Sequence, residues 1–474
     1  MKYRSTRGGL PPAPFTEILI EGLAPDGGLV VPETVPTVTP DELEAWRELD
    51  YAGLAAEVIG RYASGLSAEA LADICRAAYA PEVFGGEPIV PLTPLGEVTL
   101  VGLSEGPTLA FKDMAMQFLG QLLEHELTER GTTLNILGAT SGDTGSAAEY
   151  ALRGKHGVAV FMLSPQGRMS AFQRAQMYSL TDENIHNIAV EGDFDDCQHL
   201  VKVLAGDTAF KREHRLGAVN SINFARIAAQ LVYYFWAWLR HSDAVEPAER
   251  AGHRVSITVP SGNFGNIFSG WLARRMGLPL HRLVLATNEN NVLDEFFRTG
   301  VYRPRTGEAT FATSSPSMDI SRASNLERFV FEVLGRDPEA LREHWAGLER
   351  DGVLDLSAEQ HRFAAEFGIV SGASSHAERV ETIRETHRAT GVVVDPHTAD
   401  GLAVAARHLE PGIPMLVLET AKPQKFPEIV AEAIGAPAEL PAELRELLEA
   451  PQHVVDVPND AVAVRNLIEA HAAH

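Results

Sequence analysis

The stretch VSITVPSGNFGNIFSGWLARRM, residues 255–276, combines a β-branched apolar run, a glycine-rich loop and a helical pattern in immediate succession. Residues 255–259 are predicted to form a buried strand and residues 267–276 a helix. In the loop between them, Pro260 to Asn266, glycines allow the backbone to approach an anion at the positive end of the helix dipole. Because the loop lacks the G-x-x-x-x-G-K-[ST] and G-x-G-x-x-G signatures, it suits a single phosphate better than a nucleotide. The alternative is a glycine-rich turn that only caps the helix.

Short apolar runs alternate with helical patterns on both sides of this stretch. The alternation predicts βαβ units and a largely parallel, doubly wound α/β sheet, in which ligands bind beyond the carboxyl ends of the strands. The predicted strands are 134–139, 158–163, 185–190, 255–259, 283–286, 392–394 and 415–418. The apolar segment 227–239 is shorter than the roughly 20 residues of a membrane span and contains Gln230, so it is predicted to be a core helix.

The chain is predicted to divide into a leading unit and a catalytic region. Proline-rich punctuation and helical patterns set residues 1–90 apart as a helical N-terminal unit. The catalytic region, 91–474, is expected to form a small lobe over about 100–220 and a large lobe over about 221–474. Within the large lobe, the charged segment 298–391 is predicted to be an insertion or a lid.

Composition restricts the partners that the protein can have. The 474 residues carry a formal net charge of −24, which disfavours nucleic acid and anionic membranes as partners. A bound anion therefore needs a local set of donors. Cys75 and Cys197 lie far apart, without the spacing of a disulfide framework or a zinc site, and the N-terminus lacks the apolar segment of a secretion signal. These observations favour a cytoplasmic protein without a metal.

One lysine has the setting that a Schiff base requires. In GPTLAFKD, residues 106–113, Lys112 follows a Gly-Pro turn and begins an apolar helical run. Apolar surroundings disfavour the charged ammonium, which lowers the pKa and leaves a neutral amine able to attack an aldehyde. The alternative is a solvated lysine at a helix start, paired with Asp113.

Further donors follow other predicted strands. The loop ATSGDTG, residues 139–145, can direct backbone and hydroxyl donors at a carboxylate or phosphate, or Ser141 or Asp143 can simply cap the next helix. Thr420, at a strand end, can form a hydrogen bond with a heteroaromatic nitrogen, whereas His397 is more often a structural histidine. Candidate phosphate donors elsewhere, each of which is a solvated side chain in the simpler interpretation, are Arg168, Ser170, Asn220, Asn223, Arg226, Lys422 and Lys425.

Taken together, GPTLAFKD, ATSGDTG, VPSGNFGN, NSIN and ETAKPQKF resemble the motif series of the threonine synthase family, in its long microbial and fungal form. YRSTRG, APDGGLVVPE, SPSMDISRASN and DPHTADG extend the resemblance over nearly the whole chain. The resemblance implies a fold type II pyridoxal-phosphate enzyme with doubly wound, mostly parallel sheets in two lobes and an additional helical N-terminal domain. It also implies the conversion of O-phospho-L-homoserine and water to L-threonine and phosphate.

The resemblance assigns roles to individual residues. Lys112 is expected to form the Schiff base and act as the catalytic residue, and Thr420 to face the pyridine nitrogen. Asp143 stands near the cofactor 3′-oxygen, where relatives often have asparagine, and Lys422-Pro423 replaces the usual histidine-proline. The residues expected to hold the cofactor phosphate are Gly262, Asn263, Phe264, Gly265 and Asn266. The residues expected around the substrate are Thr140, Ser141, Gly142, Thr144, Arg168, Ser170, Asn220, Asn223, Arg226, Lys422 and Lys425.

Other functions fit parts of this pattern. A phospholyase that releases 2-oxobutyrate, or a serine/threonine dehydratase, uses the same cofactor, but a dehydratase needs no second phosphate site. A catalytically silent ligand-binding protein on this scaffold does not need Lys112. The missing dinucleotide fingerprint disfavours an oxidoreductase. The expected partner is therefore a small phosphorylated amino acid, with no nucleic acid, membrane or obligate protein partner.

Overall fold

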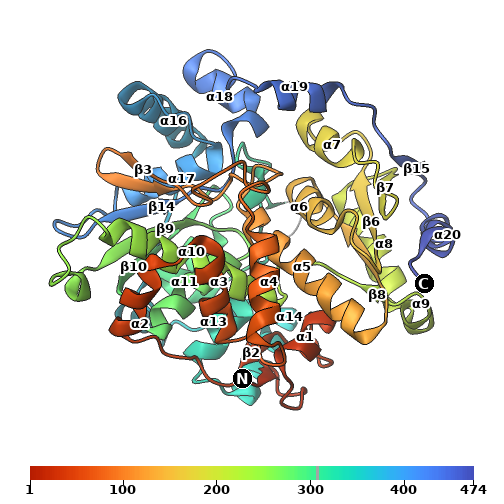
Figure 1. Cartoon of the computed structure of the whole chain (residues 1–474), viewed down its shortest axis with the longest axis horizontal. Coiled ribbons are helices and arrows are strands. Elements are labelled where there is room, and N and C mark those ends of the chain that lie inside the picture. Colours follow the sequence, from red (N-terminus) through yellow and green to blue (C-terminus); the bar gives the residue numbers. More distant parts are fainter. Residues whose placement is uncertain (306–308) are drawn as a thin grey trace.

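The computed structural model describes residues 1–305 and 309–474, which form two lobes that each contain a parallel sheet. Figure 1 shows the large sheet, with β9, β10, β14 and β3, on one side of the molecule, and the small sheet, with β6, β7 and β8, on the other. The large sheet has the order β13 (Ile369–Ala373), β10 (Leu280–Thr287), β9 (Val255–Pro260), β14 (Met415–Leu418), β4 (Val98–Val101) and β3 (Leu92–Leu95). The small sheet has the order β15 (Val455–Val457), β7 (Ile185–Val190), β6 (Val158–Pro165), β5 (Leu134–Ala139) and β8 (Leu216–Gly217).

All strand pairs in these two sheets are parallel except β3 with β4. Every residue of β6, β9 and β14 is buried, which explains why these strands appear in the sequence as continuous apolar runs. Two short antiparallel pairs lie outside the sheets, β1 (Tyr3–Ser5) with β2 (Val30–Pro32) and β11 (Val301–Tyr302) with β12 (Leu354–Asp355). The predicted doubly wound α/β fold is thus confirmed.

One predicted strand is wrong, and five strands of the two sheets were missed, namely β3, β4, β8, β13 and β15. Residues 392–394 form no strand, because Gly391 ends one helix in a left-handed conformation and Asp395 caps the next, which leaves three residues between two helix ends. Val394 is buried there without pairing to a sheet. Among the missed strands, β13 has the sequence IVSGA, in which small and polar residues hide the apolar signal. Since β13 is an edge of the large sheet, segment 298–391 is part of that sheet's architecture as well as a connection.

Helices cover both sheets. Those of the N-terminal unit are α1 (Phe15–Glu21), α2 (Pro40–Ala45), α3 (Tyr51–Gly60) and α4 (Ala68–Ala78). Those that follow up to residue 213 are α5 (Lys112–Arg130), α6 (Asp143–Leu152), α7 (Ala171–Tyr178), α8 (Phe194–Gly206) and α9 (Thr208–Glu213). The remainder are α10 (Phe224–Ser242), α11 (Gly265–Met276), α12 (Val292–Thr299), α13 (Leu326–Val333), α14 (Pro338–Asp351), α15 (Gln360–Ala365), α16 (His376–Thr390), α17 (Pro396–Ala405), α18 (Pro427–Ile434), α19 (Ala442–Glu449) and α20 (Ala461–His471).

Helix α10 lies at the centre of the main hydrophobic core. It packs against α3, α5 and α11, and almost all of its residues are buried, which confirms the predicted core helix at 227–239. Within the described parts of the chain, no helix is long and apolar enough to cross a membrane.

The N-terminal unit shares this core with the large lobe. Tyr3 and Tyr62 contact Phe224 of α10 through their rings, and the Trp236 indole donates to the Val90 carbonyl oxygen at 2.9 Å. The Arg7 guanidinium also reaches the Glu327 carboxylate of α13 at 2.7 Å. Residues 1–90 are therefore distinct in sequence but not in packing.

The C-terminal segment returns to the small lobe. In Figure 1 it runs, in blue, from α18 through α19 to β15 and α20 beside the small sheet. Strand β15 extends that sheet by pairing with β7. The chain thus crosses between the lobes at both ends of the catalytic region, since β3 and β4, which precede α5, belong to the large sheet.

Candidate active site

Lys112 is the first residue of α5 and is presented by a tightly constrained turn. The Asp113 carboxylate accepts from the Thr108 backbone N–H at 2.8 Å and from its hydroxyl at 2.7 Å. A Cβ on Gly106 would lie 2.5 Å from the Asp113 Cβ, so glycine is required there. Burial lowers the pKa of the Lys112 ammonium to about 8, although Asp143 opposes this shift. A substantial neutral fraction of the amine near neutral pH follows, as a nucleophile requires.

The chain that follows β14 pairs with the segment before Lys112. The Phe111 N–H donates to the Thr420 carbonyl oxygen at 2.8 Å, and the Lys422 N–H donates to the Leu109 carbonyl oxygen at 3.0 Å. The Thr420 N–H in turn donates to the Thr398 hydroxyl at 3.0 Å. These hydrogen bonds bring the segments that contain Lys112 and Thr420 side by side, although the two residues are remote in sequence.

Asp143, at the start of α6, joins the two lobes. Its Oδ1 lies 2.9 Å from the Lys425 ammonium, and its Oδ2 accepts from the Ser317 hydroxyl at 2.7 Å. Lys425 and Lys112 together hold the pKa of this buried carboxyl well below its usual range. Lys425 is also buried, and its ammonium donates to the Thr108 carbonyl oxygen at 2.8 Å.

The glycine-rich loop after β9 has the backbone form expected of an anion site. Phe264 precedes α11 with φ 66°, a left-handed conformation that is uncommon outside glycine. A Cβ on Gly262 would lie 2.9 Å from the Ile320 Cγ1, so the loop is tightly covered by the 315–325 segment. The Asn263 carbonyl accepts from the Asn325 N–H at 3.0 Å.

The side chain of Asn266 points into the core, since its Oδ1 accepts from the Tyr233 and Tyr234 hydroxyls at 2.7 and 2.8 Å. The backbone N–H of Asn266, in the first turn of α11, remains available to bind an anion. The N–H groups of a first turn have no partner within their own helix.

Arg226 has an unusual environment in the first turn of α10. Its side chain is buried, and its Nε and Nη1 have no hydrogen-bond partner among the described residues. Burial lowers the pKa of this guanidinium to about 10, and its charge also lowers the pKa of Lys112. Buried donors of this kind are costly unless an anion satisfies them, so the geometry points to an anionic ligand at Arg226, whose charge also acts on Lys112.

The other residues predicted to bind substrate differ in their surroundings. The Thr140 hydroxyl accepts from the Gly142 and Gly145 N–H groups, which stabilises the loop itself. Asn223 caps α10 by accepting from the Ala225 N–H and donates to the Leu19 carbonyl oxygen. Thr144 and Asn220 are partly buried, and Gly142 is buried against the Gln173 side chain. Ser141, Arg168 and Ser170 are exposed, with Ser170 capping α7.

Lys422 lies apart from the Asp143–Lys425 pair. Its ammonium is held by the Glu105 and Glu419 carboxylates at 2.6 and 3.2 Å. These three residues line a cavity of about 380 Å³ whose other walls include Leu100, Val392 and Val393.

Ser317 and its support were not predicted as site residues. The Ser317 N–H donates to the His397 Nε2 at 3.0 Å, and His397 Nδ1 is 2.7 Å from the Asp395 carboxylate. Asp395 and His397 thus hold Ser317 against Asp143. The motifs SPSMDISRASN and DPHTADG were the only sequence signal for this arrangement, and neither indicates that the two segments touch.

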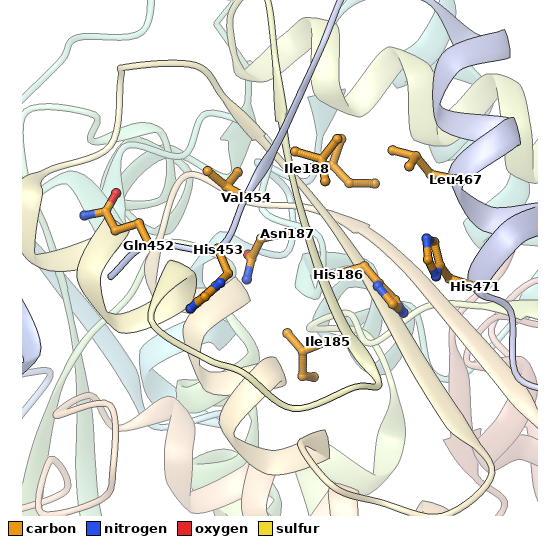
Figure 2. A pocket seen from close by; sticks show the side chains of 10 residues that line it. Ile185, His186, Asn187, Ile188, Gln452, His453, Val454, Leu467 and His471 are labelled. Atoms are coloured by element: carbon orange, nitrogen blue, oxygen red, sulfur yellow. The ribbon is translucent and has the colours of Figure 1, made fainter. Parts of the chain in front are cut away.

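A second cavity, of about 390 Å³, lies at the amino end of β7 and is shown in Figure 2. It is lined by His186, Asn187, His453, Leu467 and His471, among others. Ligand sites of parallel sheets lie at the carboxyl ends of the strands, so a cavity at the amino end of β7 is not where this principle places a ligand site of the small sheet. In the described parts of the chain, no group of three or more His, Cys, Asp or Glu side chains is arranged to hold a metal ion.

Three family models match consecutive parts of the chain. "Threonine synthase N terminus" matches residues 2–79, "Pyridoxal-phosphate dependent enzyme" matches residues 82–377, and "Threonine synthase, C-terminal" matches residues 398–468.

Individual relatives match over the full length. The chain is 52% identical over 481 residues to a threonine synthase of Methylobacillus glycogenes, covering 99% of this chain and 100% of the relative. It is 51% identical over 477 residues to a threonine synthase of Corynebacterium glutamicum, covering 99% and 98%. The crystal structure of threonine synthase with bound pyridoxal phosphate from Brucella melitensis has a TM-score of 0.95 and 39% identity, covering 100% of both chains.

Proposed function

The chain belongs to the threonine synthase family of pyridoxal-phosphate-dependent enzymes, and we propose that it converts O-phospho-L-homoserine and water to L-threonine and phosphate. The observation that carries the proposal is the buried Arg226 guanidinium beside Lys112, with Nε and Nη1 unpaired. A substrate with a phosphate group supplies the acceptors that this arginine lacks. A substrate without one leaves its charge unsatisfied.

The residues present fit the cofactor. The Lys112 amine, with its pKa lowered to about 8, is suited to covalent attachment of an aldehyde. The first N–H groups of α11 and the backbone of Gly262 to Phe264 would hold the cofactor phosphate, since the left-handed Phe264 turns the loop into the helix. The Thr420 hydroxyl is the proposed neutral partner of the ring nitrogen. Asp143, near the proposed position of the 3′-oxygen, is an acceptor that Lys425 and Ser317 keep ionised.

Proton transfer is assigned to Lys112. Pyridoxal phosphate, when bound, supplies an electron sink for the charge left when the proton next to the substrate amino group is removed. The Lys112 Nζ is the proposed base for that proton and the group that carries protons to the neighbouring carbons. A base of pKa near 8 suits this shuttle at physiological pH.

Arg226 and Lys425 are the proposed donors to the substrate phosphate. Lys425 uses two of its three N–H donors on Asp143 and Thr108, which leaves one for the substrate. The loop Thr140 to Gly145 with Asn220, Asn223, Arg168 and Ser170 completes the proposed substrate surroundings. Phosphate leaves from the γ-carbon into this cluster of donors, and water adds at the β-carbon. The retained phosphate is the proposed acceptor for the proton of that water.

Product analysis tests the reaction. The purified holoenzyme is incubated with O-phospho-L-homoserine, and threonine, 2-oxobutyrate and phosphate are measured by mass spectrometry and a phosphate assay. We expect threonine and phosphate in equal amounts. Release of 2-oxobutyrate in place of threonine would make the chain a phospholyase, and turnover of serine or threonine at a comparable kcat/KM would make it a dehydratase.

A cytoplasmic location is also proposed. The two cysteines, Cys75 and Cys197, are both free and buried, which fits a compartment in which disulfides do not form.

A further inference from the structure

Lys422 forms a partly buried cluster of charges that the proposed chemistry does not use. Its ammonium lies 2.6 Å from Glu105 Oε1, 3.2 Å from Glu419 Oε1 and 3.4 Å from Glu419 Oε2. The Lys422 side chain is 24% exposed, and that of Glu419 only 9%. Burial raises the pKa of the Glu419 carboxyl, and the Lys422 ammonium opposes this rise.

The two carboxylates come from neighbouring strands of the large sheet. Glu419 directly follows β14, and Glu105 lies in the loop after β4, which pairs with β14 in parallel. The Ser104 N–H donates to Glu419 Oε2 at 3.2 Å. Without a cation between them, Glu105 and Glu419 would repel each other, and the loop that follows β4 would separate from the end of β14.

That loop leads directly to Lys112. Leu109 has φ 58°, a left-handed conformation that a branched side chain adopts only when its surroundings enforce it. Its carbonyl oxygen accepts from the Lys422 N–H, Ala110 forms a β-bridge with Ala421, and the Phe111 N–H donates to the Thr420 carbonyl oxygen. The 105–111 loop that the Lys422 cluster holds therefore leads directly to Lys112. The segment that it pairs with contains Thr420.

We propose that Lys422 is a positioning residue, whose ammonium, clamped between Glu105 and Glu419, fixes the 105–112 loop so that Lys112 and Thr420 keep their relative placement. The inference rests on the proposed function, because it takes Lys112 as the reacting amine. Lys422 acts through the loop and does not touch the substrate. The cavity lined by Glu105, Glu419 and Lys422 is large enough for water molecules. Removal of the lysine is therefore expected to loosen the loop without leaving an empty space in the core.

The test compares Lys422→Met with Lys155→Met in the holoenzyme. Lys155 is a matched control, because it pairs with Glu124 at 2.8 Å, with side chains 15% and 30% exposed, and lies outside the site described above. We expect Lys422→Met to lower kcat for phosphate release by about 10- to 100-fold, the scale of a misplaced reacting group, with KM changed less than about twofold. Lys155→Met keeps kcat.

Two further variants distinguish a loss of positioning from misfolding. Lys422→Arg should restore most of kcat, because a guanidinium also binds two carboxylates. Glu105→Gln, at a partly exposed position, should lower kcat in the same direction by a smaller factor. An unchanged kcat in folded Lys422→Met would overturn the proposal, as would a raised KM with unchanged kcat, which indicates a substrate contact. Phosphate is released whether the product is threonine or 2-oxobutyrate, so kcat for phosphate release tests the role of Lys422 in both cases. A 2-oxobutyrate product would reject the proposed function alone.

Discussion

At the scale of single residues, Asp143 connects the two lysines of the site. Its charge raises the pKa of Lys112, and its carboxylate pairs with Lys425 at 2.9 Å. Asp143→Asn should therefore shift the pKa of Lys112 below about 8. The rate at which the apoenzyme captures pyridoxal phosphate depends on the neutral amine, so its pH profile should move to lower pH. A profile with the same midpoint in both proteins would show that Asp143 does not act on Lys112.

Replacing Arg226 should make the protein more stable and its binding of substrate weaker. Replacement by Gln removes a buried charge with unpaired donors, so the free energy of unfolding of the apoenzyme should rise by about 1–3 kcal/mol. The same change should raise KM for O-phospho-L-homoserine by roughly 10- to 100-fold, because hydrogen bonds to a charged group are lost. Urea unfolding and steady-state kinetics measure the two effects. A variant that is less stable and has an unchanged KM would mean that Arg226 is structural.

Individual residues of the site were predictable to different degrees. The Gly-Pro turn and apolar helix made Lys112 a candidate, and the glycines of 260–266 made their loop a candidate anion site, because both signals are local in sequence. The pairing of Lys422 with Glu105, across 317 positions, has no local signal. Ser317 was missed for the same reason, since its role depends on contacts with Asp143 and His397 that only folding creates.

At the scale of elements, α6 carries an unusual acid six residues after Asp143. Both Glu149 oxygens are buried, and neither has a hydrogen-bond partner among the described residues. Burial raises the pKa of Glu149 well above its usual value. An ionised carboxylate that is buried without a partner is costly, so the fold favours the protonated acid.

Glu149→Gln should therefore change the pH dependence of stability. A carboxyl with a raised folded-state pKa stabilises the fold fully below its unfolded-state pKa, and this contribution is lost as pH rises through the folded-state pKa. The glutamine variant cannot lose a proton, so its advantage over the wild type should grow between pH 6 and pH 9. Urea unfolding at the two pH values measures it. A constant difference would show that folding does not raise the pKa of Glu149 into or above this range.

Most elements with strong apolar signals were predicted correctly, whereas strands with weak signals were missed. The runs at 134–139 and 255–259 became β5 and β9, because β9 is buried along its whole length and β5 over its first four residues. The valines at 392–394 look like a strand, but helix ends on both sides leave no room for one. Strand β13 is an edge strand with a small-residue sequence, so its place was decided by pairing with β10 and not by its own composition.

At the scale of the whole molecule, the N-terminal unit and the large lobe share one core. Tyr3, Tyr62 and Trp236 belong to the same cluster of buried side chains, and the Arg328 guanidinium donates to the Val30 carbonyl oxygen at 3.0 Å. A chain lacking residues 1–79 should expose the aromatic face of α10 and aggregate. Size-exclusion chromatography and tryptophan fluorescence test this outcome. A monomeric truncated protein with a native-like emission spectrum would show that the unit is an independent domain.

The whole account depends on Lys112 as the amine that binds the cofactor. Reduction of the holoenzyme with borohydride fixes the cofactor to its lysine, and peptide mass spectrometry then identifies the modified residue. We expect the added mass on the peptide that contains Lys112, with Lys422 and Lys425 unmodified. The added mass on Lys425 or Lys422, or no modified lysine in an active preparation, would contradict the account.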